Sequence, residues 1–322
     1  MTRYFATHFG TYEAERTPDG QCALRPYRHD PRPAALGLHY LELAAHRVRV
    51  AQPMVRRGWL AGDGGLGRGE DEFVAVDWDE AIAHVAGELE RVRTHHGNEA
   101  IYAGSYGWAS AGRFHHAQSQ LKRLLNLLGG FTSSRNSYSY GAAAVILPHV
   151  LGPAYADTNA CAPSWDHITT HTDCLIAFGG FRLSNAQCDA GGVAQHSVAG
   201  WLNQALERGM RLIVVSPDGA DAPPGENVIH VPIRPNTDGA LMLAMAHVLL
   251  ARGAVDSERV SRYASGVEAF TVYVRGDDDR TPKSPRWASR ITGVPEATIE
   301  RLADQLMLPT SLINLSLSLI HI

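Results

Sequence analysis

Two stretches of this sequence combine hydroxyl-bearing and aromatic side chains within turn-like segments. Residues 104–112 carry Tyr106 and Trp108, and residues 133–141 carry Tyr138 and Ser139. Their O–H and indole N–H groups can donate hydrogen bonds, and loops held between rigid elements are where binding and catalytic side chains concentrate. The residue types fit either a pair of functional loops or two ordinary turns whose aromatic side chains pack into the core.

Two histidines indicate a different chemistry. His167 and His171 stand four residues apart, which places both imidazoles on one face of a helix, as in zinc hydrolases. The glutamate of the zinc-protease motif is missing, and two β-branched threonines between the histidines weaken the helix. A zinc-dependent hydrolase is therefore the less favoured alternative. The chain contains no G-x-S-x-G motif of a serine hydrolase.

A glycine-rich stretch at residues 62–67, GDGGLG, formally matches the fingerprint of dinucleotide-binding folds. No strand clearly precedes it, and an acidic stretch follows in place of a helix. We therefore interpret this match as accidental.

The elements that must position the two loops are predicted from apolar periodicity. Residues 100–103 form a predicted short strand that leads into the first loop. The helix between the loops ends at Gly129, and its apolar face consists of Ala117, Leu121, Leu124, Leu125 and Leu128. An earlier helix starts with the capping pair Asp77 and Glu80 and ends at Gly97. Its apolar face consists of Ile82, Val85, Leu89 and Val92.

The second half of the chain alternates strands with helices. Strands are predicted at residues 174–178, 212–215, 228–233 and 311–314, with helices between them. This order predicts parallel strands with right-handed crossovers, and ligands of such sheets lie beyond the carboxyl ends of the strands. The residues at those ends are Gly179, Gly180, Ser216, Pro217 and the turn at 234–238. Glycines there let backbone N–H groups approach phosphate, although simple turn chemistry explains them equally well.

Several motifs in a fixed order resemble the dimethyl sulfoxide reductase family of molybdopterin oxidoreductases, and within it the biotin sulfoxide and trimethylamine N-oxide reductases. The motifs are ATHFGTY, QPMVRRGWL, GSYGWASAGRFHHAQSQ, NSYSYGAAAVILPHVLG, HTDCLIAFGGFRLSNAQ, RLIVVSP and VPIRPNTDGALMLA. They extend over nearly the whole chain, to about Asn314. Chains of this family run much further, so the resemblance implies an N-terminal fragment.

The resemblance implies a molybdenum ion held by two molybdopterin guanine dinucleotides. Ser139 matches the serine whose oxygen completes the ligands of the metal, and a hard oxygen donor suits a high-valent ion. Tyr106 and Trp108 match catalytic residues that donate hydrogen bonds to the reacting oxygen. Trp108 and Tyr138 are also implied to contact the cofactor.

The same resemblance implies that the second half of the chain binds one guanine dinucleotide. The matching positions are Gly179, Gly180, Asn185, Ser216, Pro217, Thr237 and Asp238. An aspartate such as Asp238 can accept hydrogen bonds from guanine N–H groups. Ser184 departs from the lysine that close relatives often carry before the asparagine, and this removes one expected pterin or phosphate contact.

The implied function is molybdenum-dependent reduction of S-oxides or N-oxides, such as biotin sulfoxide, methionine sulfoxide, dimethyl sulfoxide or trimethylamine N-oxide. Two electrons and two protons arrive, and the substrate oxygen leaves as water. An unidentified donor supplies the electrons, because Cys22, Cys161, Cys174 and Cys188 lack iron–sulfur spacing and no cluster is expected. The alternative is an incomplete, non-catalytic fragment of such an enzyme.

Charge and composition do not favour a nucleic-acid-binding or a membrane-spanning protein. The formal net charge is −4 and no basic block is present, so nucleic acid is not an expected partner. No apolar run is long enough to cross a bilayer. The N-terminus lacks an apolar leader and a twin-arginine pair, so a cytoplasmic protein is expected.

The expected fold is α/β, with two open, mostly parallel αβα sheet units around a cofactor cleft and a small β-rich N-terminal piece. The expected domains are the β-rich piece at 1–50, a first α/β part with the metal-ligand loop at 51–158, and an incomplete dinucleotide-binding domain at 159–314. Residues 315–322 have strand-like composition without a cap or a charge, and they are expected to be an artefactual tail.

Overall fold

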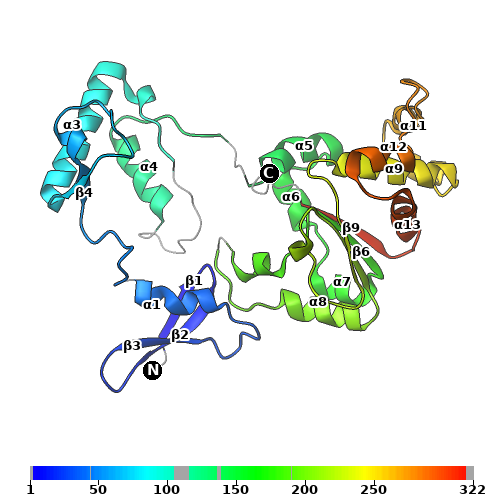
Figure 1. Ribbon diagram of the computed structural model, residues 1–322, viewed down its shortest axis with the longest axis horizontal. Coiled ribbons are helices and arrows are strands. Elements are labelled where there is room, and N and C mark those ends of the chain that lie inside the picture. Colours follow the sequence, from blue (N-terminus) through cyan, green and yellow to red (C-terminus); the bar gives the residue numbers. More distant parts are fainter. Residues whose placement is uncertain (1–2, 44, 105–115, 136–138, 190, 317–322) are drawn as a thin grey trace. The chain divides into compact units, whose positions relative to one another are not determined.

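The computed structural model describes residues 3–43, 45–104, 116–135, 139–189 and 191–316 (Figure 1). Three predicted site residues, Tyr106, Trp108 and Tyr138, lie outside these ranges. The chain forms two compact units. The first consists of Met1–Arg135 with Gln187–His196, and the second of Asn136–Ala186 with Ser197–Ile322.

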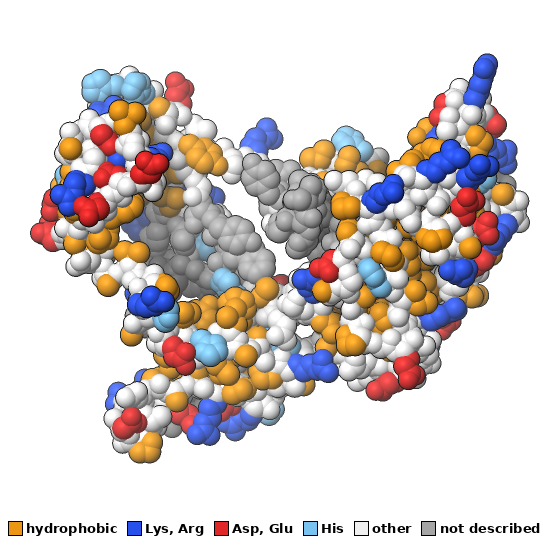
Figure 2. Space-filling model, viewed as in Figure 1, with side chains coloured by type: hydrophobic (Ala, Val, Ile, Leu, Met, Phe, Trp, Pro, Cys, Tyr) orange, Lys and Arg blue, Asp and Glu red, His pale blue; other side chains and the backbone are white. Residues whose placement is uncertain are grey.

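The surface carries charges of both signs. Lys and Arg side chains are interspersed with Asp and Glu side chains over the face shown in Figure 2, among patches of hydrophobic side chains. No helix within the described ranges is both long and apolar enough to cross a membrane.

The first unit begins with a small antiparallel sheet, which confirms the β-rich start that the sequence predicts. Strands β1 (Arg3–Thr7), β2 (Gly10–Arg16) and β3 (Cys22–Pro26) pair in that order. The 3₁₀ helix η1 (Ala35–His39) and the short helix α1 (Tyr40–Leu43) follow the sheet.

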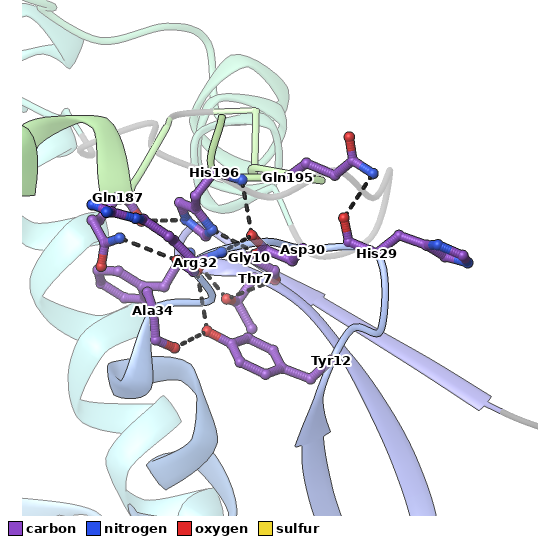
Figure 3. A network of polar contacts seen from close by, with 11 residues as sticks. Thr7, Gly10, Tyr12, His29, Asp30, Arg32, Ala34, Gln187, Gln195 and His196 are labelled. Atoms are coloured by element: carbon purple, nitrogen blue, oxygen red, sulfur yellow. Dashed lines mark hydrogen bonds and ion pairs between the residues drawn. The ribbon is translucent and has the colours of Figure 1, made fainter. Parts of the chain in front are cut away.

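Tyr12 on β2 is the centre of the core of this sheet. Its side chain is fully buried, and its hydroxyl donates a hydrogen bond to the carbonyl oxygen of Ala34 at 2.7 Å (Figure 3). The ring lies against the backbone of Gly37, where an added Cβ would stand 2.1 Å from ring atoms. Burial raises the pKa of the Tyr12 hydroxyl, so the group remains a proton donor at neutral pH.

Tyr12→Phe is expected to lower the free energy of unfolding of this unit by about 1–3 kcal/mol, because the buried Ala34 carbonyl loses its donor. Urea denaturation followed by aromatic fluorescence measures the change. Tyr4→Phe, at a tyrosine on β1 that is 58% exposed, is the matched control and should cost much less. Equal losses in the two variants would contradict the role of the Tyr12 hydroxyl.

A second hairpin encloses the glycine-rich stretch. Strands β4 (Met54–Arg56) and β5 (Phe73–Ala75) pair antiparallel, and α2 (Arg57–Leu60) starts the connection between them. The buried guanidinium of Arg56 donates hydrogen bonds to the carboxylates of Asp63 and Asp71 and closes the connection. Residues 62–67 therefore form a loop within a hairpin, with no helix after it. The structure confirms that the dinucleotide fingerprint is accidental.

The two long helices of the first unit form as predicted. In α3 (Trp78–His96), the carboxylate of Asp77 accepts the backbone N–H of Glu80 at 2.8 Å, and Gly97 ends the helix. A 3₁₀ turn, η2 (Asn98–Ala100), follows it. The helix α4 (Ala117–Leu127) occupies the predicted position between the two loops.

The apolar faces of these helices remain largely uncovered by the described part of the first unit. Ile82 and Val85 on α3 are 59% and 61% exposed, and Leu124 on α4 is 50% exposed. The strand predicted at 100–103 is a single parallel bridge between Tyr102 and Thr132. In this respect the structure differs from the expected parallel sheet: within the described residues, the helices have no sheet of their own to pack on.

The second unit contains the parallel sheet that the alternating pattern predicts, and the α/β fold class is confirmed. The strands are β6 (Cys174–Phe178), β7 (Arg211–Val215), β8 (Val228–Val231) and β9 (Ser311–Leu315). They are all parallel, in the order β8-β7-β6-β9. The intervening helices include α8 (Val198–Glu207), α9 (Asp238–Ala251) and α13 (Glu296–Leu306).

Both faces of this sheet are buried, as parallel sheets require. Ile176 and Phe178 of β6 pack with the side chains of α9 and α13 on one face, whereas Leu175 and Ala177 pack with α8 on the other. The period of two along β6 therefore divides one continuous apolar run between two cores. The remaining helices are α5 (Gly141–Leu151), α6 (Tyr155–Ala160), α7 (Trp165–His171), η3 (Leu183–Gln187), η4 (Gly219–Asp221), α10 (Ser257–Tyr263), α11 (Val267–Arg275) and α12 (Pro285–Thr292).

The two compact units divide after residue 135, whereas the expected boundary between the first and second α/β domains lies after residue 158. The physical reason is the position of α5, which packs with α6 within the second unit. Ala143 on α5 is buried there, at 1% exposure. The metal-ligand loop expected at Ser139 therefore lies in the unit that contains the parallel sheet.

Candidate functional site

The strand order of the second unit creates a topological switch point. From β6 the chain proceeds to β7 and β8 on one side, and it returns to β9 on the other side of β6. Crevices at such points, beyond the carboxyl ends of the strands, are the usual ligand sites of open α/β sheets. The carboxyl ends of β6 and β9 are Phe178 and Leu315, which are paired in register.

A cavity of about 480 Å³, here called the glycine cavity, opens at this point. Its lining consists of Gly179, Gly180, Phe181, Arg182, Leu183, Asn185, Ala186, Val198, Asp218, Asp221 and Ser316. Three of these residues, Gly179, Gly180 and Asn185, are among the positions that the sequence analysis singled out.

Two glycines are required by the shape of this cavity. Gly179 has a φ of +90°, and a Cβ added there would stand 2.8 Å from the Cβ of Ser316. Gly180 has a φ of +97°, and its Cβ would stand 3.0 Å from the side chain of Asp221. Side chains at either position would fill the space that the backbone now leaves open.

A charged cluster forms the rim of the glycine cavity. The Arg182 guanidinium donates from Nε to Asp221 at 2.8 Å and from Nη2 to Asp218. The backbone N–H of Ala220 and the Arg182 guanidinium hold the pKa of the Asp218 carboxyl below its ordinary value. The hydroxyl of Ser216, which is only 1% exposed, donates to the second oxygen of Asp221. Two carboxylates and one guanidinium thus leave one net negative charge.

A second cavity of about 390 Å³, here called the serine cavity, adjoins the first. Ser139 and Tyr140 line it at the start of α5, together with residues of α6 and with Asn314 and Leu315 at the end of β9. Ser316 lines both cavities. Ser139 therefore lies in a cavity that shares a wall with the glycine cavity.

Other predicted positions lie outside both linings. Thr237 donates its hydroxyl to the carbonyl oxygen of Arg234 at 2.7 Å, and Asp238 begins α9. Pro217 follows the buried Ser216 at the end of β7. The roles assigned to these residues and to Ser139 remain predictions.

The charged cluster of Arg182, Asp218 and Asp221 was not among the predicted site residues. Part of this cluster is visible in the sequence, because both aspartates lie in the turn that follows the predicted strand at 212–215. What the sequence pattern cannot reveal is the pairing with Arg182, which stands 39 residues from Asp221.

The histidine pair behaves as the helical spacing predicts. His167 and His171 lie on one face of α7, with ring centroids 4.7 Å apart. Across the described ranges, no group of three or more His, Cys, Asp or Glu side chains could hold a metal ion. The histidine pair thus has no third protein ligand among these residues, which a zinc site requires.

Comparisons with known proteins show which family the chain matches. The profile of the family described as molybdopterin oxidoreductase matches residues 49–295. A biotin sulfoxide reductase of Cereibacter sphaeroides is 44% identical over 92% of this chain and 40% of that protein. A dimethyl sulfoxide/trimethylamine N-oxide reductase of Rhodobacter capsulatus is 34% identical over 92% of this chain and 36% of that protein.

One solved structure is similar in fold. Acetylene hydratase from Pelobacter acetylenicus matches 97% of this chain and 40% of its own chain, with a TM-score of 0.57 and 21% sequence identity. The chain thus spans about two fifths of the length of the relatives it matches.

Proposed function

Because the chain belongs to the molybdopterin oxidoreductase family, we propose that it forms the cofactor-holding part of a reductase of S-oxides or N-oxides. The family implies a molybdenum–molybdopterin cofactor. The observation that carries the proposal is the pair of adjoining cavities at the switch point, one lined by Gly179 and Gly180 and the other by Ser139.

The glycine cavity suits one guanine dinucleotide of a bis(molybdopterin guanine dinucleotide) cofactor. The open backbone at Gly179 and Gly180 would let a pyrophosphate approach closely. The carboxylates of Asp218 and Asp221 and the amide of Asn185 would accept hydrogen bonds from the O–H and N–H groups of a nucleoside. The volume of about 480 Å³ lies within the range of ligand pockets.

The predicted positions outside the lining would complete this site. The Ser216 hydroxyl would fix the orientation of Asp221, to which it donates, and Pro217 would hold the turn after β7. Asp238 would accept from guanine N–H groups, with Thr237 beside it at the start of α9.

Ser139 would supply the oxygen ligand that the protein gives to the metal. A serine oxygen is a hard donor that suits a high-valent ion. Tyr106 and Trp108 would donate hydrogen bonds to the oxygen of the substrate, and Tyr138 and Trp108 would contact the cofactor. When bound, the cofactor supplies the two electrons that, with two protons, convert an S-oxide or N-oxide to the sulfide or amine and water.

The partners of the proposed enzyme are a small S-oxide or N-oxide and a separate electron donor. We propose that this chain holds no iron–sulfur cluster. Cys174 is buried within β6, where burial raises the pKa of its thiol, and Cys22 lies exposed on β3, far along the chain from Cys161 and Cys188. Such spacing does not match the closely spaced thiolates of a cluster.

A second candidate reading is that these 322 residues alone are inactive. The exposed faces of α3 and α4 favour it, because Ile82, Val85 and Leu124 present a continuous apolar surface to solvent. The chain expressed by itself would then associate with chaperones or aggregate, whereas the complete protein would reduce its substrate.

The composition of the complete protein, as expressed from its gene in a host that makes molybdenum cofactor, tests the proposal. We expect molybdenum, no iron, and about two guanine nucleotides per metal after acid release. Elemental analysis and chromatography of the released nucleotide measure these quantities. Zinc alone, or no metal, would mean that the likeness is one of fold, and the oxygen-transfer assignment would be dropped.

A further inference from the structure

Residues 187–189 and 191–196, between β6 and α8, belong to a segment that the proposed function does not use. They belong to the first unit, although the residues before and after them belong to the second. Hydrogen bonds hold them to the N-terminal sheet and the chain that follows it (Figure 3). The backbone N–H of Asp189 donates to the carbonyl oxygen of His8 at 3.1 Å. The side-chain amides of Gln195 and Gln187 donate to the carbonyl oxygens of His29 at 3.0 Å and Arg32 at 3.3 Å, respectively.

His196 and Asp30 are the centre of this attachment. Their side chains are 4% and 0% exposed. The backbone N–H of His196 donates to one oxygen of Asp30 at 3.0 Å, and the ring Nδ1 lies 2.6 Å from the other. The second ring nitrogen, Nε2, lies 3.1 Å from the carbonyl oxygen of Gln187.

The partners of the ring determine its charge. A carboxylate and a backbone carbonyl can only accept hydrogen bonds, so the ring satisfies both contacts only with a proton on each nitrogen. Burial opposes the charge on Asp30, but hydrogen bonds from the backbone and ring of His196 and from the Arg32 N–H outweigh it. The pKa of Asp30 therefore lies below its ordinary value of 3.8. Tyr12 also faces Asp30, as a neutral hydroxyl bound to Ala34.

The His196 ring also joins the two ends of the segment. Gln187 begins it and His196 ends it, so the contact between Nε2 and the Gln187 carbonyl closes a loop. Ala186, directly before this loop, and Val198, two residues after it, both line the glycine cavity. The contact therefore holds close together the two points from which the chain continues into the lining of the cavity.

We propose that His196 and Asp30 form a buried ion pair that clamps the loop at 187–196 and thereby holds together the two chain segments, at Ala186 and Val198, that line the glycine cavity. Both are positioning residues, since neither lines the cavity. The role of the clamp in cofactor binding rests on the proposed function, but the ion pair itself does not. Removal of one partner would leave the other charge buried without compensation, which is strongly destabilising.

Two isosteric variants of the complete protein test the clamp. Asp30→Asn keeps the size of the side chain and can still accept the His196 N–H, but it removes the charge. His196→Gln can reach only one of the two oxygens that the ring contacts. Each change is expected to speed amide hydrogen exchange in residues 187–198 at least about tenfold. In the double variant, the increase in exchange rate should be smaller than the product of the increases in the two single variants. Guanine nucleotide per protein should fall by about half or more.

Glu13→Gln is the matched control. Glu13 is also buried on β2 and pairs with Arg28, which follows β3 and donates from Nε to Glu13 at 2.7 Å. This control should leave exchange at 187–198 and nucleotide content unchanged. Ring ¹⁵N resonances of the wild-type protein, assigned by their loss in His196→Gln, should show a proton on each nitrogen, as the two acceptors require.

Different outcomes would overturn the His196–Asp30 clamp and the proposed function. A neutral His196 ring, or an Asp30→Asn protein with wild-type exchange and full nucleotide content, would overturn the clamp. An equal effect of Glu13→Gln would also overturn it, because general loosening of the sheet would then suffice. Wild-type protein without molybdenum or guanine would instead overturn the proposed function, and the clamp would then be judged by exchange and ring protonation alone.

Discussion

Ser139→Ala is expected to abolish reduction of S-oxides and N-oxides, by at least about 100-fold in kcat/KM, while the complete protein keeps its fold. The change removes the oxygen that we propose as the ligand to the metal, and it adds no bulk to the serine cavity. Steady-state assays with a reduced dye as the electron donor measure the loss. Molybdenum content measured in parallel shows whether the metal is still present.

Two further variants make this result specific. Ser139→Cys replaces a hard oxygen with a softer thiolate and should alter the absorption spectrum while retaining some activity. Ser261→Ala is the control, because Ser261 lies on α10 of the same unit and donates its hydroxyl to the local Glu258 carbonyl at 2.8 Å. Near-wild-type turnover of Ser139→Ala with full molybdenum would exclude Ser139 as the ligand.

Gly179→Ala is expected to remove most of the bound guanine nucleotide and to lower activity to the same extent. Its backbone φ of +90° disfavours any side chain by about 1–2 kcal/mol. The new Cβ would also stand 2.8 Å from the Cβ of Ser316, so the ends of β6 and β9 would have to separate. Because Ser316 lines both cavities, this displacement changes the shape of each.

Gly209→Ala separates the clash from the backbone strain. Gly209 lies in the same unit with a φ of +103°, and a Cβ added there would meet no atom within 4 Å. This variant should lose stability in thermal denaturation but keep its nucleotide. If Gly179→Ala and Gly209→Ala retained nucleotide equally, the close approach of β6 and β9 would have no part in cofactor binding.

The parallel sheet and most helices of the second unit could be predicted because their signals are local. The run at 174–178 is apolar at every position, as a strand buried on both faces must be. The capping pair of Asp77 and Glu80 fixed the start of α3 in the same way. Periodicity shows which face of a helix is apolar, but not whether anything covers it, and so the exposure of Ile82 on α3 does not follow from the local pattern.

The candidate site was predictable only where it follows from strand ends. Gly179, Gly180 and Asn185 come directly after β6, and the structure brings all three to one cavity. The contacts of Arg182 with Asp221, and of His196 with Asp30, span 39 and 166 residues. No local pattern encodes a pairing at such separation, because it depends on how the whole sheet is assembled.

The position of β9 also determines when the two cavities can form. Asp173 and Thr310, which meet at the start of β6 and β9, are 137 residues apart along the chain. During synthesis the ribosome delivers β6, β7 and β8 well before β9, so one edge of β6 stays unpaired in the growing chain. Ser316, the wall common to both cavities, emerges later still. A large ligand at this site can therefore be enclosed only after translation has passed this strand, and until then the β6 edge is open to pairing with other chains.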